Sequence, residues 1–357
     1  MDSTDRSVQT SRDAALRYPF ATEPGTGDGS AVSVAPGVLW LRMPLFAALP
    51  WINVWALADG AGWTIVDTGL NTAAATAAWG TAIAGALDGR PVTRVLVTHM
   101  HPDHCGLAGW LTERFATHLW MTRLEYLSCR LLAADTGRTP PPDAIAFYVG
   151  TGWDAAALAR YAEKFGAFGR MIHPLPASYR RITDGECLSI GGREWIVVVG
   201  NGHSPEHACL YCPALKLLIS GDQVLPRISS NVSVYPTEPD ADPLGDWQNS
   251  LVSLALRIPD DVLVLPAHNS PFTGLHARLD QLSAQHRAAL ARLQELLAAP
   301  RRAVDVFGAL FARPIGPEVL GMATGEAVAH LNHLLWSGCA RRDRAADGVW
   351  WWRRTRD

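Results

Sequence analysis

Three histidines and one aspartate fall within six positions of this chain, in the segment Thr-His-Met-His-Pro-Asp-His at 98–104. The apolar, β-branched run at 92–97 directly precedes them and is typical of a buried strand. The cluster is therefore expected where a rigid strand ends and the backbone turns, a usual place for a functional site. Side chains two positions apart in an extended segment point the same way. His99 and His101 can therefore share one metal ion, while Asp103 and His104, after a proline, can face a second, adjacent ion.

The same pattern recurs at three later places in the chain. His203 follows the strand-like run 195–199, Asp222 follows 217–219, and His268 follows 262–265, each with a glycine or proline close by to turn the chain. A lone histidine after a strand is more often a capped loop residue than a metal ligand. Four occurrences of one pattern reverse that preference and favour a metal site.

These motifs together resemble the metallo-β-lactamase superfamily of metallohydrolases. The resemblance spans residues 35 to 275, and it implies an α/β fold, a four-layer αββα sandwich of two facing β-sheets with helices outside. Because one fold hosts many reactions, the resemblance is much less specific for the substrate. The matching motifs are, in chain order, Val66-Asp67-Thr68-Gly69, the 98–104 cluster, Gly202-His203, Gly221-Asp222 and Pro266-Ala267-His268.

Carried over residue by residue, the resemblance implies a dinuclear metal site. One metal would have three histidine ligands, and the other would have two histidines and an aspartate, with a further aspartate bridging the pair. The ligands of the first metal are His99, His101 and His203, those of the second are Asp103, His104 and His268, and the bridging residue is Asp222.

Two further residues are expected to hold ligands in place from behind. Asp67 is implied as a group that orients the ligands, a role that metal sites usually need, and a turn residue in Asp-Thr-Gly is the alternative. His207 is expected to hydrogen-bond near the site rather than to bind metal. Zn²⁺ is the first candidate cofactor because imidazole and carboxylate suit it, and iron and manganese remain candidates.

The implied reaction is hydrolysis. Two cations bridged by one hydroxide lower the pKa of the bound water from near 16 toward about 7 and so give a nucleophile at neutral pH, which would attack a thioester carbonyl. The second cation would stabilise the developing oxyanion. Asp103 is expected to be catalytic as well as a ligand, since its carboxylate can hold or shuttle a proton.

The substrate class is narrowed by residues near Asp222. Asp222 resembles the aspartate of glyoxalase-II-like thioesterases, lactonases and nucleases, whereas β-lactamases of the commonest zinc class have a cysteine at this position. Lactonase relatives carry a tyrosine at the position of Leu225. The leading hypothesis is a glyoxalase-II-like hydrolase of acyl-CoA or hydroxyacyl-glutathione thioesters. A lactone or ester hydrolase comes second and a metal-dependent ribonuclease third.

The loop 226–231 is the first candidate for contact with the substrate. Within it, Arg227, Ser229 and Asn231 are the expected substrate-binding residues. The guanidinium of Arg227 could bind a carboxylate or phosphate, and an ordinary surface arginine is an equally good interpretation.

Composition favours a cytoplasmic enzyme. A net charge of −3 argues against a protein that binds polyanions, and the chain has no run of 18 apolar residues that could cross a membrane. Residues 1–30 are polar and lack the apolar core of an export signal, so we expect a flexible leader there. Without an export signal, the six cysteines are expected to be reduced.

The remainder divides into a catalytic domain at 31–283 and a C-terminal domain at 284–357. A helical cap is expected at about 105–190, with helices near 105–117, 122–134 and 154–168. Its aromatic side chains either line an acyl pocket or pack the cap onto the body, and packing is favoured for most of them.

The C-terminal domain resembles a winged-helix module. Helices are expected at 285–298, 303–311 and 326–335, followed by a hairpin strand at 349–352. The third helix would enter a DNA groove, yet it holds no lysine or arginine, and a DNA reader usually needs cations there. We therefore expect a packing module or a homodimer interface, with a small molecule rather than nucleic acid or membrane as the partner.

Overall fold

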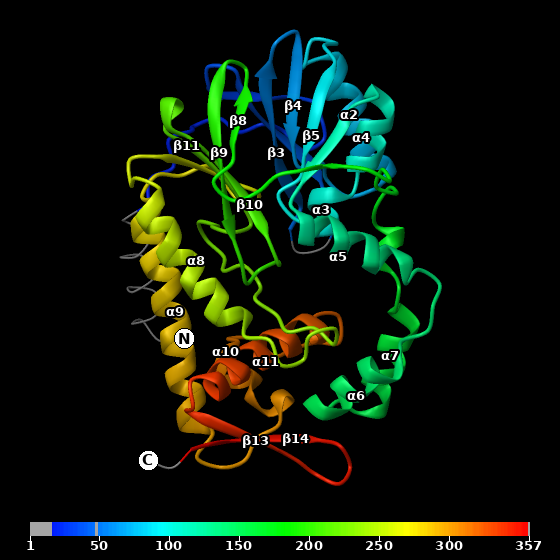
Figure 1. Cartoon of the computed structure of the whole chain (residues 1–357), viewed down its shortest axis with the longest axis vertical. Helices are drawn as coiled ribbons and strands as arrows, with labels where there is room; N and C mark the ends of the chain where they lie inside the picture. The colour runs from blue at the N-terminus through cyan, green and yellow to red at the C-terminus, as the bar shows by residue number, and fades with distance from the viewer. Residues whose placement is uncertain (1–15, 47–48, 356–357) are drawn as a thin grey trace.

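The structure is a computed structural model that describes residues 16–46 and 49–355. Two β-sheets lie face to face in one half of the molecule, with α2 (Ala73–Ala84) and α4 (Ala108–Phe115) outside one sheet (Figure 1). The other sheet is covered by α8 (Pro243–Arg257) and α9 (Leu275–Leu296). These four layers confirm the predicted αββα sandwich.

The first sheet has seven strands in sequence order, β1 to β7. Its first four strands pair antiparallel, and β4 to β7 pair parallel. The strands are β1 (Val32–Ala35), β2 (Val38–Pro44), β3 (Trp51–Asp59), β4 (Gly62–Val66), β5 (Val92–Leu96), β6 (His118–Met121) and β7 (Arg180–Arg181).

The second sheet has five strands in the order β12-β11-β10-β9-β8. All neighbours pair antiparallel except β11 and β12, which run parallel. The strands are β8 (Cys187–Ile190), β9 (Arg193–Gly200), β10 (His207–Cys212), β11 (Leu217–Gly221) and β12 (Leu263–Pro266).

Alternation along the strands builds a core on each face of the first sheet. In β3, Trp55 and Leu57 face the second sheet, whereas Val54 and Ala56 face α2 and α4. This is the period of two expected of a strand that is buried on both faces. Trp55 is only 1% exposed, and burying a large side chain of this kind contributes about 2 kcal/mol of transfer free energy.

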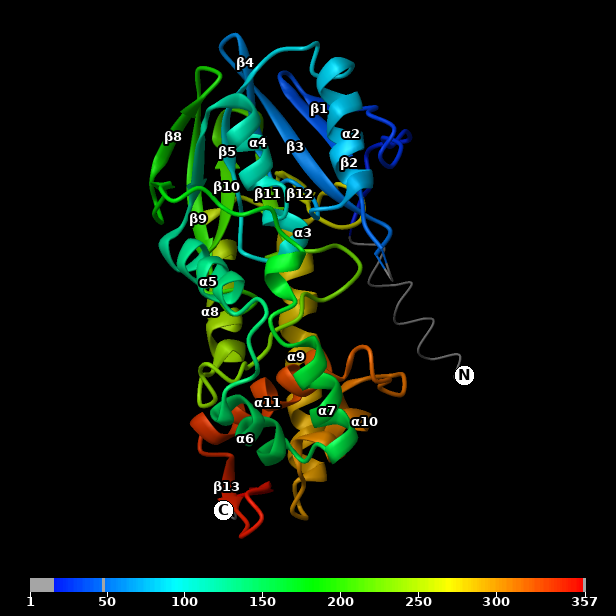
Figure 2. The same cartoon turned by 90° about the vertical axis from the view of Figure 1, so that its right-hand side faces the viewer.

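The predicted cap differs from the observed one in extent. The start of the 105–190 segment belongs to the sandwich, since α4 packs on the first sheet and β6 is one of its strands. The excursion away from the sandwich consists of α5 (Arg123–Ala134), α6 (Pro142–Thr151) and α7 (Ala155–Lys164). Figure 2 shows α6 and α7 beside the C-terminal helices, at the far end from the sheets.

The cap aromatics pack against one another and against the C-terminal domain. The rings of Tyr148 and Trp153 stack with centroids 4.1 Å apart, and Phe147 meets the ring of Trp350 edge-on at 5.7 Å. The indole N–H of Trp153 donates to the hydroxyl of Thr324 at 2.9 Å. For these side chains, the contacts favour packing over the lining of an acyl pocket.

The C-terminal region begins inside a continuous helix. The helix predicted at 285–298 is α9, which starts ten residues earlier at Leu275, so the expected boundary at 283/284 falls within it. The last of the helices is the long α11. A hairpin follows it, in the order of elements that the sequence predicts. The elements after α9 are the 3-10 helix η3 (Ala303–Val306), α10 (Phe307–Leu310), α11 (Leu320–Trp336), β13 (Ala340–Arg344) and β14 (Trp350–Arg354).

Part of the expected flexible leader is held against the catalytic body. Residues 1–15 lie outside the described residues. From residue 16 onward the structure differs from the prediction, because Leu16 is buried and Arg17 forms a β-bridge with Thr273. Glu23 makes an ion pair of 2.6 Å with the buried Arg42. Within the described ranges, every helix is too short or too polar to cross a lipid bilayer.

Candidate metal centre

Four loops that follow strands meet at one edge of the sandwich. They come after β5, β9, β11 and β12, and the short helix α3 (Pro102–Cys105) starts inside the first of them. Figure 1 shows α3 at the end of the strands that faces the C-terminal half. Because strands that run in the same direction end at the same edge, residues far apart in the sequence come together here. All seven predicted metal ligands lie in this cluster.

Three imidazoles form the first group of donors. His99 Nε2 lies 2.9 Å from His101 Nδ1 and 3.2 Å from His203 Nε2. The two histidines from the 98–104 loop thus face a third one that is contributed by the loop after β9. This is the set that the sequence resemblance implies for the first metal.

The second group joins a carboxylate to two imidazoles. Asp103 Oδ2 lies 3.3 Å from His268 Nε2 and 3.7 Å from His104 Nε2. Asp222 stands between the two groups. Its Oδ2 is 3.5 Å from His203 Nε2, a member of the first group, and 3.6 Å from His104 Nε2, a member of the second.

Hydrogen bonds on the outer side fix which imidazole nitrogen faces the centre. A carbonyl or carboxylate oxygen can only accept here, so the Nδ1 of a histidine that contacts it must carry the proton. His104 Nδ1 donates to Asp67 at 2.8 Å, His203 Nδ1 to the Asn231 carbonyl at 2.7 Å, and His268 Nδ1 to the Trp51 carbonyl at 3.3 Å. Each of the three therefore turns Nε2 toward the cluster.

Two buried atoms of the cluster have no hydrogen-bond partner among the described residues. They are His104 Nε2 and Asp222 Oδ1. A buried acceptor without a partner destabilises a fold by about 1–3 kcal/mol, and lone pairs of neighbouring imidazoles repel one another unless a cation lies between them. Imidazole nitrogens with carboxylate oxygens are the donor set that suits Zn²⁺. The residues present thus fit two divalent cations.

The pKa directions agree with this donor set. Burial, aided by neighbouring imidazoles, lowers the pKa of His99 well below its ordinary value and that of His101 to about 3. Burial opposes ionisation of Asp222, but His268 and His104 outweigh it and hold its pKa well below the ordinary range. Neutral imidazoles and an ionised carboxylate are the protonation states in which these groups bind a cation.

Two histidines of the cluster differ from His99 and His101. Against the effect of burial, the carboxylates of Asp222 and Asp103 raise the pKa of His268 above its ordinary value. The stronger shift is that of His104. Burial alone would lower its pKa, but the carboxylates of Asp103, Asp67 and Asp222 together raise the pKa well above the ordinary value. Two divalent cations would supply the positive charge that these carboxylates otherwise draw from a proton on His104.

Asp67 holds the loop that carries the first histidines. Its carboxylate accepts from the main-chain N–H of Thr98 at 2.8 Å and from the Thr98 hydroxyl, besides His104 Nδ1. The backbone of Asp67 adopts a left-handed conformation with φ of 62°, which aspartate tolerates better than most residues. The Asp67 side chain therefore orients the ring of His104 and fixes the start of the loop that carries it.

His207 points one ring nitrogen at the backbone and not at the donor cluster. Its Nε2 accepts from the main-chain N–H of Asp222 at 3.1 Å. The ring packs so closely on Gly221 that a Cβ there would lie 2.6 Å from His207 Cε1. The glycine before Asp222 thus makes room for a histidine that positions Asp222.

One buried carboxylate of this site is missed by the sequence reasoning. Glu125, on α5, is fully buried and accepts from the main-chain N–H of Met100 at 2.8 Å and from that of Glu206 at 2.7 Å. Burial raises the pKa of Glu125 despite these bonds. Glu125 therefore joins the loop of His99 and His101 to the loop of His203. An acidic residue on a buried helix face is the only sequence signal for it.

Asn53 plays a similar part for the loop of His268. Its side-chain amide donates to the carbonyls of Pro266 at 2.8 Å and Asn269 at 2.6 Å. The sequence offers no signal for this role, because Asn53 lies inside an apolar strand far from the loop in sequence.

The three expected substrate contacts have different surroundings. Arg227 is exposed, and its guanidinium lies 5.0 Å from the ring centroid of Tyr18. Ser229 lines a cavity between α9 and α11. Only Asn231 contacts the donor cluster, through its carbonyl to His203, while its side-chain amide donates to Glu326 at 2.8 Å.

Comparisons with known proteins match both parts of the chain. Residues 52–268 match the family described as the metallo-beta-lactamase superfamily, and residues 290–355 match the metallo-beta-lactamase-like C-terminal domain. A curated relative, the probable metallo-hydrolase YqjP of Bacillus subtilis (strain 168), is 26% identical over 308 residues, covering 83% of this chain and 92% of the relative.

Two solved structures resemble the whole chain. A beta-lactamase domain protein from Burkholderia ambifaria is 42% identical with a TM-score of 0.89, and the match covers 97% of this chain and 100% of that one. A metallo-beta-lactamase family protein from Thermus thermophilus is 26% identical with a TM-score of 0.74, and the match covers 90% of this chain and 100% of that one.

Proposed function

The chain belongs to the metallo-β-lactamase superfamily, and on this basis we propose that it is a dinuclear, zinc-dependent hydrolase of thioesters in a glyoxalase-II-like branch. Acyl-CoA and hydroxyacyl-glutathione compounds are the substrate classes. The observation that carries the dinuclear part is the place of Asp222, whose carboxylate lies within 3.6 Å of imidazoles from both donor groups. When bound, two such cations lower the pKa of water and polarise a carbonyl oxygen.

Asp103 is the residue that we assign to proton transfer. Its side chain is 24% exposed, against 11% for Asp222 and 3% for His268. It therefore stands at the open side of the cluster, where a substrate arrives. His104 and His268 hold the pKa of Asp103 at about 2 against the effect of burial, so the carboxylate is ionised at neutral pH, the state in which it can bind a cation. Its exposed position is the reason for the assignment: it can receive the proton released by the attacking water and pass it to the departing thiolate.

The buried members of the cluster have a positioning task. Asp67, Asn231 and the Trp51 carbonyl fix three imidazole rings, and Glu125 fixes the two loops that carry most of the others. Donors that are held in this way need no rearrangement during the reaction, which is the main means by which such sites lower a barrier.

Residues after Asp222 support a thioester more than a lactone. The position that carries a tyrosine in lactonase relatives is Leu225, which is 2% exposed and has no hydroxyl to offer.

The C-terminal domain also agrees with a small-molecule substrate rather than a nucleic acid. Ten of the seventeen residues of α11 are buried, so this helix has no free face that could enter a nucleic-acid groove.

Metal content and a substrate panel test the proposal together. We expect purified protein to hold two equivalents of metal and to hydrolyse S-acyl thioesters faster than lactones or a short RNA. In Asp103→Ala, one equivalent should be lost and turnover should fall by about a hundredfold or more. Asp280→Ala is the control, since Asp280 is an exposed aspartate on α9.

Each part of the proposal has its own contrary result. Turnover of lactones or RNA alone would remove the thioester assignment and leave the site intact. Full activity of Asp103→Ala with both metals retained would remove Asp103 from the reaction. Less than one metal and no activity after loading with zinc, iron or manganese would remove the mechanism.

A further inference from the structure

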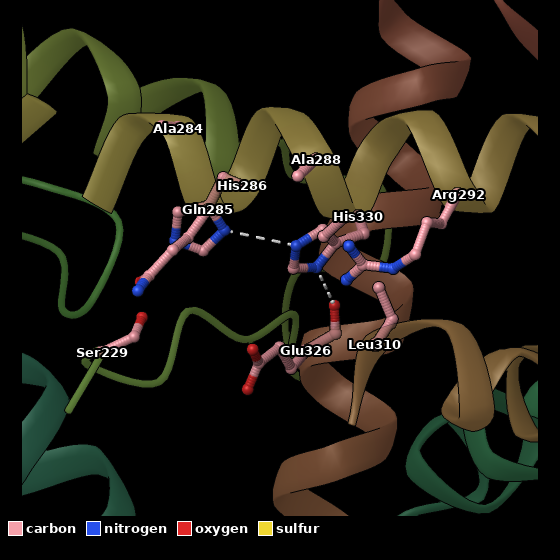
Figure 3. A pocket seen from close by; sticks show the side chains of 10 residues that line it. Ser229, Ala284, Gln285, His286, Ala288, Arg292, Leu310, Glu326 and His330 are labelled. Atoms are coloured by element: carbon pink, nitrogen blue, oxygen red, sulfur yellow. Dashed lines mark hydrogen bonds between the residues drawn. The ribbon is translucent and has the colours of Figure 1, made fainter. Parts of the chain in front are cut away.

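A cavity lined by both polar and apolar side chains lies between the loop after Asp222 and the C-terminal helices. It has a volume of about 320 Å³ and lies beside α9, α11 and Ser229 (Figure 3). None of the seven predicted metal ligands lines it. Its walls are formed by Ser229, Ala284, Gln285, His286, Ala288, Ala289, Arg292, Leu310, Glu326 and His330.

Hydrogen-bond directions in the cavity can be deduced from one main-chain oxygen. The carbonyl of Glu326 can only accept, so His330 Nδ1, at 2.8 Å, carries a proton. Burial lowers the pKa of His330 to about 4 and that of His286 to about 3, so both rings are neutral at pH 7. His330 Nε2 is then an acceptor, and His286 Nδ1 donates to it at 3.3 Å. The remaining nitrogen, His286 Nε2, therefore presents a lone pair.

Glu326 contributes a carboxylate without a cationic partner. Its Oε2 accepts from the Asn231 amide at 2.8 Å, and no described cationic side chain forms an ion pair with it. Burial raises its pKa to about 7, which reflects the absence of a compensating charge. Arg292 also lines the cavity but forms no ion pair with Glu326, and its Nε donates to the Ala309 carbonyl. Figure 3 shows the Arg292 guanidinium beside His330, while the Glu326 carboxylate points toward the side of Ser229 and Gln285.

We propose that this cavity binds the primary ammonium group of a ligand, and that the ligand is the thiol part of the substrate. A group that donates several hydrogen bonds and carries a positive charge matches a buried carboxylate and an imidazole lone pair. Asn231 connects the cavity wall to the donor cluster, because its amide donates to Glu326 and its carbonyl accepts from His203. On this proposal, a substrate held in the cavity by one end has its thioester on the side of the donor cluster.

The proposal rests on the thioester function and narrows it. Peptide thiols of the glutathione type carry a free ammonium group, whereas coenzyme A has none. The chain should therefore prefer acyl-peptide thioesters, and Glu326 should be the residue that makes the distinction.

Two thioethers that cannot be hydrolysed test this by direct binding. S-Methylglutathione has the ammonium group, and N-acetyl-S-methylglutathione differs in having that group converted to an amide. By isothermal titration calorimetry on the metal-loaded full chain, we expect the first to bind about ten- to thirtyfold more tightly. This comparison within the unmodified protein does not depend on any variant folding correctly.

Glu326→Gln then locates the effect. The glutamine keeps the shape and an oxygen for the Asn231 amide but removes the charge, so the two probes should bind within about threefold of each other. The control Glu295→Gln removes an exposed carboxylate on α9 and should keep the full preference. Propylamine is a third probe, which carries the ammonium group alone. If the unmodified chain binds propylamine but neither thioether, and Glu326→Gln abolishes this binding, the cavity recognises the ammonium group of a separate ligand.

Other outcomes would overturn the proposal. Equal binding of both thioethers by the unmodified chain would exclude ammonium recognition, as would a preference that persists in Glu326→Gln. So would the absence of binding by both thioethers and by propylamine. Because no probe is hydrolysed, failure of the thioesterase assays with an intact preference would reject the proposed function and leave this site standing.

Discussion

At the level of single residues, the hydrogen bonds around the donor cluster should determine its metal affinity as well as the donors themselves. Glu125 accepts one main-chain N–H with each of its oxygens. A glutamine at this position can accept only one of them, and its amide N–H would face the other donor. Leaving a buried donor unpaired destabilises by about 1–3 kcal/mol. We therefore expect Glu125→Gln to weaken metal binding by about ten- to a hundredfold in a chelator competition.

Glu206→Gln is the matched control for that variant. Glu206 accepts a single main-chain N–H, from Leu124 at 2.8 Å, which a glutamine oxygen can also accept. The Glu206→Gln variant should therefore keep a metal affinity within about threefold of that of the unmodified protein. Unchanged affinity in Glu125→Gln would show that the two ligand loops hold their positions without this carboxylate.

The proposed metal ligands and the residues that hold them differ in how far the sequence reveals them. His99, His203 and His268 each follow an apolar strand, and this local pattern is enough to bring them together. Glu125 and Asn53 act on loops distant in sequence, and nothing in their own neighbourhood distinguishes them from ordinary helix and strand residues. Such partners become visible only when the topology brings their elements side by side.

At the level of elements, contacts between residues distant in sequence also explain why α9 is predicted to start at residue 285, whereas it begins at Leu275. Leu275, Leu279 and Leu282 repeat at helical spacing, but Arg278 interrupts the apolar face. The structure buries that arginine, and its guanidinium donates to the carbonyls of Leu225 and Ile228. A buried cation satisfied by a distant loop cannot be expected from periodicity, so the pattern of the first turns of α9 indicates a polar segment.

The cap helices give the next prediction, because their aromatic residues pack onto the C-terminal domain. Trp153 and Thr324 are linked by one hydrogen bond of 2.9 Å, and Thr324 is fully buried. In a double-mutant cycle of Trp153→Phe and Thr324→Val, we expect a coupling free energy of about 1 kcal/mol in chemical denaturation. The phenylalanine keeps the ring stacked on Tyr148, so the cycle isolates the hydrogen bond.

A role in substrate binding would give a different pattern. If Trp153 lined an acyl pocket, Trp153→Phe would change KM with acyl chain length and leave the free energy of unfolding nearly unchanged. We expect the reverse, with stability lowered and the dependence of KM on chain length preserved. The measurement therefore decides between the two interpretations of the cap aromatics.

At the level of the whole molecule, one hydrophobic core runs from the second sheet into the C-terminal domain. It contains Leu218 of β11, Val264 of β12, Trp247 of α8, Leu331 of α11 and Trp352 of β14. The strands β11 and β12 lead directly to Asp222 and His268. A boundary drawn at 283/284 would divide this core, and composition alone gives no sign of the continuity.

Because the core is shared, metal binding should stabilise the chain as one unit. Cations that bind the folded cluster at a thousand times their Kd add about 4 kcal/mol, which raises the unfolding temperature by about 5 °C in a chain of this size. Calorimetry should show one transition in both the metal-free and the zinc-loaded protein. Hydrogen exchange should slow in the β13–β14 hairpin on zinc binding, although the hairpin holds no ligand. In Asp103→Ala the rise should be smaller. Two transitions, of which zinc shifts only one, would mean that the C-terminal domain folds independently of the metal centre.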